Sequence, residues 1–400
     1  MRWRPWLPAD TKNHAAELRR AFQARWGATP RIYRAPGRVN LIGEHTDYNE
    51  GFVMPAAIEF STWVAAAGRP DRILSIYSEN FSQLREFPLD DVGPQRGDDW
   101  TDYVRGVAVT LERAGYRLRG TNLLIRGAVP MGGGLSSSAA IEIATAFALL
   151  GVAGRVVDRT EIARIGQRAE NEFVGTWCGI MDQFIACHGM AGHAVMLDCR
   201  SLEFSLAPLP AGVRMVIANT MVRHGHAGGE YNRRRAECQE GVRHMTRVLP
   251  QIRALRDVTP AELEHYGRNL PETIFRRCRH VITENIRVGQ AAEALKRADL
   301  AQFGRLMAES HASLRDDYQV SCKELDTMVE IAVKQPGVYG SRMTGGGFGG
   351  CTINLVREER VDEFCGTVSK EYREATGKEP VLSATNAAGG AGEVTPSWRA

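Results

Sequence analysis

One segment near the N-terminus concentrates side chains that could bind the hydroxyl groups of a small molecule. It runs from residue 35 to 51, reads APGRVNLIGEHTDYNEG, and places Arg38, Glu44, His45, Asp47 and Tyr48 within eleven positions. A polyol needs a hydrogen-bond donor and an acceptor at each hydroxyl, and these side chains supply both. The apolar residues interleaved with them indicate a half-buried strand and turn rather than a solvated loop. The segment therefore predicts a polyol-binding site.

A second pair of acidic residues, Glu170 and Asp182, lies farther along the chain, with glycines at 175 and 179 between them. One carboxylate could hold Mg²⁺ together with a serine hydroxyl, while the other faces a reacting substrate hydroxyl. Magnesium usually takes only one or two protein oxygens and leaves its other positions to phosphates and water. Taken alone, each carboxylate is more often a helix-end charge or a salt bridge, so the residues by themselves leave these roles open.

The first glycine-rich loop has the chemistry of a phosphate-binding site. The sequence PMGGGLSSSAA, residues 130–140, follows an expected strand that ends near Ile125 and leads into an expected helix from Ser137. Glycines let backbone N–H groups converge on an anion, and a helix N-terminus carries about half a positive charge. A serine-capped turn is the alternative, but three glycines and three serines exceed what a cap requires. No lysine follows in the GxxxxGK[ST] frame, which excludes a Walker A loop.

The second glycine-rich loop, TGGGFGGC at residues 344–351, contains a formal GxGxxG. An extended run follows it, whereas the dinucleotide-binding fingerprint must open a helix after a strand. A protein-kinase glycine loop is excluded because no HRD or DFG triplet occurs. The loop indicates either a close approach of backbone to another domain or a ligand, or a tight bend between packed elements.

Mixed helices and strands must position the polyol-binding segment and the first glycine-rich loop, which both lie in the first half of the chain. The expected strands there are 32–35, 52–54, 61–67, 73–78, 122–125, 193–198 and 213–219, and the expected helices are 12–26, 102–114, 137–150, 160–172 and 180–187. Beyond about residue 228 helices dominate, at 230–248, 272–296, 300–314 and 323–334, before a strand at 352–356, a helix at 361–376 and a strand at 381–384. The prolines and glycine of SLAPLPAG (205–212) predict a boundary there, giving domains 1–208 and 209–400.

Composition and charge limit the partners and the compartment. Lys plus Arg number 50 against 47 Asp plus Glu, a balance too weak to indicate nucleic acid or a membrane surface. The arginine-rich stretches 233–235 and 276–279 fit solvated helix faces. The eight cysteines form no CxxC pair, the start carries no export signal, and no apolar stretch is long enough to cross a bilayer. We expect a cytoplasmic protein with no nucleic-acid or membrane partner, either a monomer or a weak dimer.

Together, the motifs resemble those of the GHMP small-molecule kinases. The stretch GRVNLIGEHTDYNEGFVMP (37–55) resembles the galactokinase signature, PMGGGLSSSAA the superfamily's phosphate loop, and RMTGGGFGGC (342–351) its third motif. CGIMDQF and EYNRRRAEC also resemble galactokinase segments, in the expected order. The resemblance implies a two-lobed α+β GHMP kinase fold with its active site in the cleft. Its N-terminal lobe would be mixed α/β and ribosomal-S5-domain-2-like, and its C-terminal lobe helix-rich with a ferredoxin-like sheet.

The resemblance also implies roles for individual residues. Asp182 and Arg38 would be catalytic, with Arg38 stabilising the transferring charge near Asp182. The implied sugar-binding residues are Arg38, Glu44, His45, Thr46, Asp47, Gly179, Asp182 and Tyr231. The implied ATP-binding residues are Ser78, Trp100, Gly132, Gly133, Gly134, Leu135, Ser136, Ser137 and Ser138, and the implied Mg²⁺ ligands are Ser138 and Glu170.

The activity implied by the resemblance is ATP-dependent phosphorylation of the anomeric 1-hydroxyl of D-galactose to galactose 1-phosphate, in galactose catabolism by the Leloir pathway. A GHMP kinase for N-acetylgalactosamine, L-arabinose or another related sugar is the alternative within enzymes. A non-catalytic galactose sensor is the alternative outside them. Such sensors resemble enzymes with a damaged phosphate loop, whereas Ser138, Glu170 and Asp182 are all present here.

Overall fold

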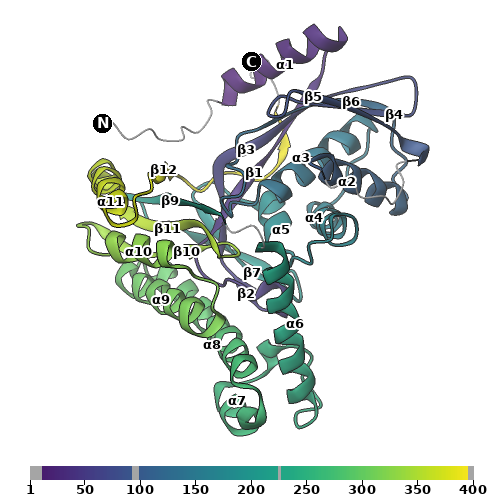
Figure 1. Cartoon of the computed structure of the whole chain (residues 1–400). Helices are drawn as coiled ribbons and strands as arrows, with labels where there is room; N and C mark the ends of the chain where they lie inside the picture. The colour runs from purple at the N-terminus through teal and green to yellow at the C-terminus, as the bar shows by residue number, and fades with distance from the viewer. Residues whose placement is uncertain (1–10, 92–98, 224–226, 395–400) are drawn as a thin grey trace.

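The computed structural model describes residues 11–91, 99–223 and 227–394, so the first ten residues lie outside the described part. Within these ranges the chain forms three β-sheets with helices packed around them (Figure 1). The strands are β1 (Arg31–Asn40), β2 (Phe52–Val53), β3 (Pro55–Gly68), β4 (Ile73–Ser78), β5 (Gln83–Pro88), β6 (Thr121–Gly127), β7 (His193–Asp198), β8 (Phe204–Pro208), β9 (Val213–Arg223), β10 (Val338–Thr344), β11 (Gly349–Arg357), β12 (Val381–Thr385) and β13 (Gly392–Glu393).

The helices fall into two groups along the chain. Those of the N-terminal half are α1 (Thr11–Trp26), α2 (Thr101–Arg113), α3 (Ser137–Val152), α4 (Arg159–Arg168) and α5 (Met181–His188), with a π-helical turn, Ala169–Val174, directly after α4. Those of the C-terminal half are α6 (Ala227–Thr246), α7 (Pro260–Tyr266), α8 (Glu272–Lys296), α9 (Leu300–Ser313), α10 (Lys323–Ala332) and α11 (Val361–Thr376).

The N-terminal lobe is built on a six-stranded sheet in the order β13-β1-β3-β6-β4-β5, antiparallel except for the parallel pair β4 and β6. Successive side chains of β3 point to opposite faces, as the pleat of a strand requires. Trp63 and Ala65 pack with α1, whereas Val64 and Ala66 join the larger core that includes α2, α3, α4 and α5. Burial on both faces holds this sheet rigidly beneath α3, whose first residues belong to the first glycine-rich loop.

The C-terminal lobe contains a four-stranded antiparallel sheet in the order β10-β11-β9-β12. In chain order these strands follow a βαββαβ path, which with this arrangement is the ferredoxin-like topology. Helix α9 packs on β10, and α10 packs on β11 and α11. The sheet ends at the second glycine-rich loop, which joins β10 to β11.

The end of the chain returns to the first lobe. Ala387 forms a bridge with Ile58, and β13 pairs with Tyr33 and Arg34 of β1. The small sheet β2-β7-β8 ends at Pro208, where the expected boundary falls. The division into 1–208 and 209–400 stays a prediction, and in the structure the contacts of residues 387–394 lie with the N-terminal sheet.

Several predicted elements have the same bounds in the structure, among them the strands at 73–78 and 193–198 and the helices at 272–296 and 361–376. Others were missed. Strand β5 is exposed along most of its length, and β10 reads VYGSRMT, so neither has the apolar alternation on which strand prediction rests. The segment predicted as a strand at 32–35 extends to Asn40 as β1, through Pro36, where the register shifts.

Candidate active site

An ion pair between Arg38 and Asp182 joins two elements that are 144 residues apart. Arg38 lies near the end of β1 and is 5% exposed, and Asp182 lies in the first turn of α5. The Nε of Arg38 donates to Oδ1 of Asp182 at 2.7 Å, and its Nη2 donates to Oδ2 at 2.6 Å. Such a two-point contact fixes both side chains in one plane. The carboxylate is therefore held in one orientation.

The first glycine-rich loop reaches the same ion pair. Nη1 of Arg38 donates to the carbonyl oxygen of Gly134 at 2.6 Å, and the Ser136 hydroxyl donates to Oδ2 of Asp182. The loop thus lies beside the carboxylate rather than apart from it, which places a predicted phosphate-binding backbone next to a predicted proton acceptor.

A cavity of about 170 Å³ opens beside this ion pair. It draws its walls from both lobes and is lined by Arg38, Glu44, His45, Asp47, Glu170, Thr176, Cys178, Met181, Asp182, Tyr231, Gly345 and Gly346. Most of these side chains are polar, as a polyol requires. Six of the eight predicted sugar-binding residues are among them.

The two other predicted sugar-binding residues, Thr46 and Gly179, do not line this cavity. The Thr46 hydroxyl donates to the carbonyl oxygens of Gly43 and Phe52, at 2.8 and 2.7 Å, and its side chain is fully buried. It therefore holds the turn together rather than facing the cavity. Gly179 lies so close to Asp47 that an added Cβ would sit 2.0 Å from its Oδ2, so glycine is required for Asp47 to occupy its place.

Burial shifts the pKa values of the titratable groups around this cavity. It raises the pKa of Asp47 to about 7, and the Asp182 carboxylate adds to that rise. The same two causes raise the pKa of Glu170 to about 7. Burial lowers the pKa of His45 to about 3, so this ring is neutral near pH 7, with its Nδ1 2.7 Å from the Tyr48 hydroxyl. His45 therefore acts as a neutral hydrogen-bonding group.

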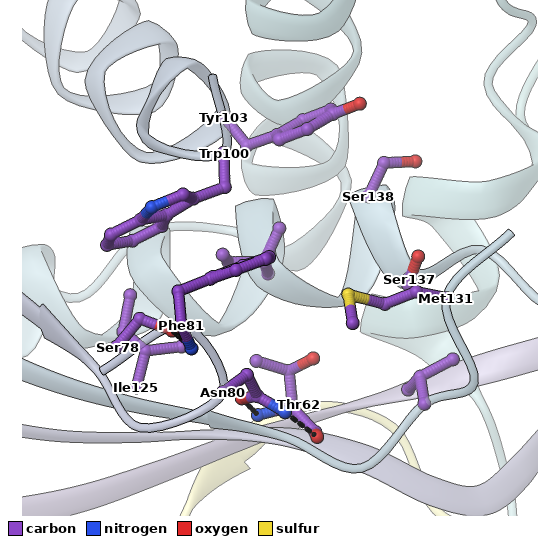
Figure 2. Close-up of a pocket in the computed structure, with 13 residues that line it drawn as sticks. Thr62, Ser78, Asn80, Phe81, Trp100, Tyr103, Ile125, Met131, Ser137 and Ser138 are labelled. Atoms are coloured by element: carbon purple, nitrogen blue, oxygen red, sulfur yellow. Dashed lines mark hydrogen bonds between the residues drawn. The ribbon is translucent and has the colours of Figure 1, made fainter. Parts of the chain in front are cut away.

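A second cavity, of about 260 Å³, borders the first glycine-rich loop at Met131, Ser137 and Ser138 (Figure 2). It is lined by Thr62, Ser78, Asn80, Phe81, Trp100, Tyr103, Ile125, Gly127, Val129, Met131, Ser137, Ser138 and Ile141. The rings of Phe81 and Trp100 stack with their centroids 5.6 Å apart. An apolar cavity with an aromatic wall suits a purine base. The predicted nucleotide residues Ser78, Trp100, Ser137 and Ser138 all line it.

The remaining predicted ATP-binding residues, Gly132 to Ser136, form the backbone of the loop between the two cavities. Gly132, Gly134 and Ser136 all have positive φ angles, of 69°, 72° and 57°. This winding loop precedes the N-terminus of α3, which favours an anion. Leu135 is instead a buried anchor, 1% exposed, so its contribution to phosphate binding is limited to its backbone.

The Ser138 hydroxyl lies close enough to the Glu170 carboxylate to lower its pKa. One hydroxyl and one carboxylate are the hard oxygen ligands that Mg²⁺ accepts when phosphates complete its shell. In the described part of the chain no group of three or more His, Cys, Asp or Glu side chains could hold a metal without a nucleotide. The two residues therefore fit a magnesium ion that arrives with ATP.

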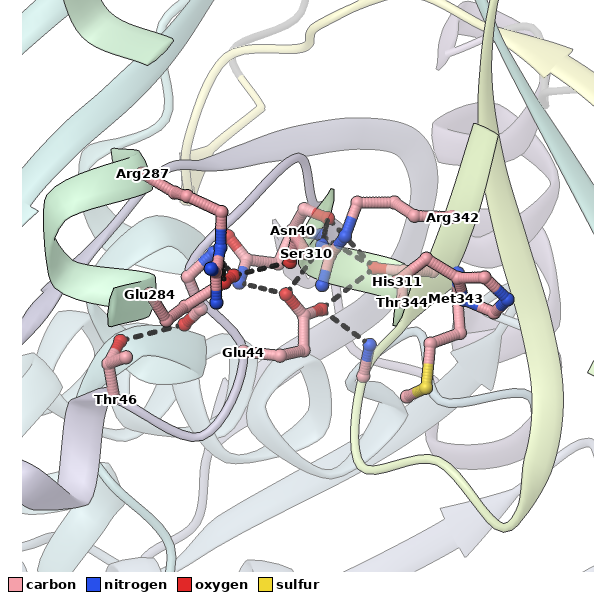
Figure 3. A network of polar contacts seen from close by, with 12 residues as sticks. Asn40, Glu44, Thr46, Glu284, Arg287, Ser310, His311, Arg342, Met343 and Thr344 are labelled. Atoms are coloured by element: carbon pink, nitrogen blue, oxygen red, sulfur yellow. Dashed lines mark hydrogen bonds and ion pairs between the residues drawn. The ribbon is translucent and has the colours of Figure 1, made fainter. Parts of the chain in front are cut away.

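The second glycine-rich loop and the strand before it hold the Glu44 carboxylate from the other lobe (Figure 3). Arg342, on β10, is fully buried, and its Nη1 donates to Oε2 of Glu44 at 2.6 Å and to the Asn40 carbonyl at 3.1 Å. The Gly345 N–H donates to Oε1 of Glu44 at 2.8 Å. A Cβ on Gly345 would sit 2.7 Å from the Gly134 carbonyl oxygen, so glycine also permits contact with the first loop.

Sequence reasoning missed several residues that the structure brings to the site. Phe81 and Tyr103 in the second cavity carry no motif, and Thr176, Cys178 and Met181 flank predicted residues without a distinguishing pattern. Arg342 opens the motif RMTGGGFGGC, two residues before the second glycine-rich loop, and its place in that motif was the available signal.

Family comparisons agree with this geometry. Residues 20–68 match the profile described as "Galactokinase galactose-binding signature", residues 102–190 match "GHMP kinases N terminal domain", and residues 291–374 match "GHMP kinases C terminal". A mevalonate kinase structure from Methanococcus jannaschii has a TM-score of 0.65 at 19% identity and covers 90% of this chain and 99% of its own. The fold and the glycine loops thus define a kinase of the GHMP class.

Relatives with higher sequence identity identify the family within the GHMP kinases. A galactokinase from Chloroflexus aggregans is 50% identical over 90% of this chain and 92% of its own, and one from Clostridium acetobutylicum is 44% identical over 91% and 94%. The crystal structure of Lactococcus lactis galactokinase complexed with galactose superposes with a TM-score of 0.92 at 38% identity, covering 95% of this chain and 100% of that one. The chain belongs to the galactokinase family.

Proposed function

We propose that this enzyme transfers the γ-phosphoryl group of ATP to the anomeric 1-hydroxyl of D-galactose, giving galactose 1-phosphate and ADP. The observation that carries the proposal is the Arg38–Asp182 ion pair, which stands in the wall of the polar cavity and contacts the glycine-rich loop at Gly134 and Ser136. A sugar hydroxyl in one cavity and a triphosphate along the loop would therefore meet at Asp182. Phosphoryl transfer asks a protein chiefly for this positioning and for stabilisation of charge.

Asp182 acts on the hydroxyl that attacks. Its carboxylate accepts or orients the proton of the 1-hydroxyl, because the two-point contact with Arg38 holds it in one plane beside the cavity. The Arg38 guanidinium, 5% exposed, also offsets the negative charge that develops on the transferring phosphoryl oxygens. In a buried site this charge is stabilised more strongly than it would be in water.

The other cavity residues select the sugar. Glu44 and Asp47 accept hydrogen bonds from hydroxyl groups, while neutral His45 and Tyr231 complete the wall. The rings of His45 and Tyr231 lie 5.5 Å apart, so they form one continuous surface against which the sugar ring can pack. Thr46 stabilises the turn that carries these residues, and Gly179 leaves room for the Asp47 side chain.

The glycine-rich loop binds the nucleotide phosphates through its backbone and the N-terminus of α3. Ser138 and Glu170 would hold Mg²⁺, which when bound supplies charge neutralisation to the phosphates. The base would lie against Phe81 and Trp100, near Ser78. Each of the predicted ATP residues then has a place along one continuous path.

A substrate panel tests the proposal. The purified protein is assayed with ATP and Mg²⁺ on D-galactose, N-acetylgalactosamine, L-arabinose and D-glucose, with coupled detection of ADP. We expect turnover on galactose with a kcat/KM at least about tenfold above that of the other sugars, equivalent to about 1.4 kcal/mol in transition-state binding. Absence of ADP release with galactose contradicts the proposal. Galactose binding without ADP release would indicate the sensor.

We also propose that the enzyme works in the cytoplasm, as a monomer or a weak dimer. All eight cysteines lie in the described part of the chain and are free thiols, five of them buried, which suits a reducing compartment. No helix among the described residues is long and apolar enough to cross a membrane.

A further inference from the structure

The residue next to Asp182 on α5 makes a contact that the mechanism above does not use. Gln183 is fully buried, and its amide nitrogen donates to Oε2 of Glu142 at 2.9 Å and to Oε2 of Glu170 at 2.7 Å. Both N–H groups of one amide are thereby directed at two carboxylates. Glu142 is also fully buried, and Glu170 is 7% exposed, so neither carboxylate can satisfy itself with bulk water.

The three residues come from the three elements that carry the phosphoryl-transfer site. Glu142 lies on α3 one turn after Ser138, and residues four apart share a face of a helix. Glu170 lies on the π-helical turn after α4, and Gln183 follows Asp182 on α5. The Gln183 amide therefore ties together the elements that present Ser138, Glu170 and Asp182.

The Gln183 side chain is tightly packed against a neighbouring helix. A Cβ built on Gly166 of α4 would sit 3.0 Å from Cγ of Gln183, so the backbone of α4 lies directly against the glutamine stem. Glycine at 166 permits this approach. A side chain confined in this way imposes its hydrogen-bonding direction on the carboxylates it contacts.

We propose that Gln183 is a positioning residue for the metal site, and that it sets the orientation of the Glu170 carboxylate by bridging it to Glu142. The inference rests on the proposed function, in which Glu170 and Ser138 bind Mg²⁺. Hydrogen-bond partners behind a metal ligand typically change metal affinity or activity by 10- to 100-fold when they are removed. Gln183 belongs to that group because it contacts Glu170 and lines neither of the two cavities described above.

The test replaces Gln183 by methionine, which has a similar length and no amide. Binding of Mn²⁺ to the complex with galactose and a non-hydrolysable ATP analogue is measured by electron paramagnetic resonance, and kcat is measured as a function of free Mg²⁺. We expect the Mn²⁺ affinity of Gln183→Met to fall about tenfold. The Mg²⁺ concentration for half-maximal rate should rise by a similar factor, with the KM for galactose within twofold of wild type.

A matched control is Gln335→Met. The Gln335 amide also bridges two groups, the Ile331 carbonyl and Glu371, but it lies three residues beyond the end of α10 and lines neither cavity. This variant should leave Mn²⁺ affinity and Mg²⁺ dependence unchanged. An equal change in both variants would overturn the inference.

A second pair of variants decides the matter if Gln183→Met fails to fold. Glu142→Met removes the other end of the bridge, whereas Glu142→Gln keeps an oxygen that accepts from Gln183. We expect weaker Mn²⁺ binding in the first and near wild-type binding in the second. Unchanged Mn²⁺ affinity in folded Gln183→Met or Glu142→Met, or a fall in kcat that is the same at every Mg²⁺ concentration, would overturn the inference. A wild-type protein without turnover on galactose would instead overturn the proposed function, while the Mn²⁺ measurements would still decide the role of Gln183.

Discussion

Replacing Arg342 by methionine should measure how much the ion pair from the C-terminal lobe to Glu44 contributes to the free energy of unfolding. The Arg342 guanidinium is fully buried and is the cation that contacts Glu44, whose side chain is 2% exposed. Methionine fills a similar length but leaves the Glu44 carboxylate without its ion pair. Breaking a buried pair from one side costs about 3–5 kcal/mol, because a buried charge stays uncompensated.

The remaining contacts place the expected loss at the lower end of that range. Glu44 still accepts from Asn40 at 2.6 Å and from the Gly345 N–H at 2.8 Å. We therefore expect urea unfolding to show a loss of about 3 kcal/mol in the free energy of unfolding. Arg315→Met is the control, because Arg315 pairs with Asp316 at the surface and such pairs contribute about 0–1 kcal/mol.

The pH dependence of the stability loss in Arg342→Met provides an independent test. Burial raises the pKa of Glu44 above its usual value even with Arg342 present, and removing Arg342 raises it further. A carboxyl with a raised folded pKa contributes most stability below its unfolded pKa and loses that contribution as the pH rises through the folded value. The deficit of Arg342→Met should therefore be smaller at pH 5.5 than at pH 8. A loss below about 1 kcal/mol, or a deficit independent of pH, would refute this reasoning.

Three further predictions concern the two cavities. Asp182→Asn should lower kcat by on the order of 10²-fold with an unchanged Kd for an ATP analogue, and a near-normal kcat would exclude Asp182 as the base. Burial raises the pKa of both Asp47 and Glu170 to about 7, so kcat/KM for galactose should fall below pH 7 as both carboxylates are lost. Asp47→Asn should make that fall shallower, leaving the part due to Glu170, and a profile as steep as that of the wild type would contradict a role for Asp47. Phe81→Ala removes the ring stacked on Trp100, and it should raise the KM for ATP about tenfold while leaving the KM for galactose unchanged. Equal rises in both KM values would count against binding of the adenine base in this cavity.

The motifs could be found in the sequence because their chemistry is local. A glycine loop that opens a helix, and a polar turn after a strand, are each recognisable within about fifteen residues. The direction of each side chain within a motif is not local in this sense. Thr46 has the same hydrogen-bonding groups as a sugar ligand, but the turn around His45, with its φ of 63°, directs the threonine hydroxyl to backbone carbonyls.

Residues that act through distant contacts leave no local pattern. Gln183 meets Glu142 across 41 positions, and Arg342 meets Glu44 across 298. Both partners of each pair are polar residues in buried segments, and a single sequence does not show which buried polar residues pair. Only the packing of the helices and the two lobes brings them together.

The structure explains why the sequence alone could not distinguish the two interpretations of the second glycine-rich loop. It was consistent with a tight bend or with a close approach of backbone to another domain. Gly345 lies at the start of the turn between β10 and β11, and its N–H donates to Glu44. Because Gly345 has no side chain, its backbone can also lie against the Gly134 carbonyl. The bend is what allows the approach. Gly345 therefore touches both the turn that carries Glu44 and the first glycine-rich loop.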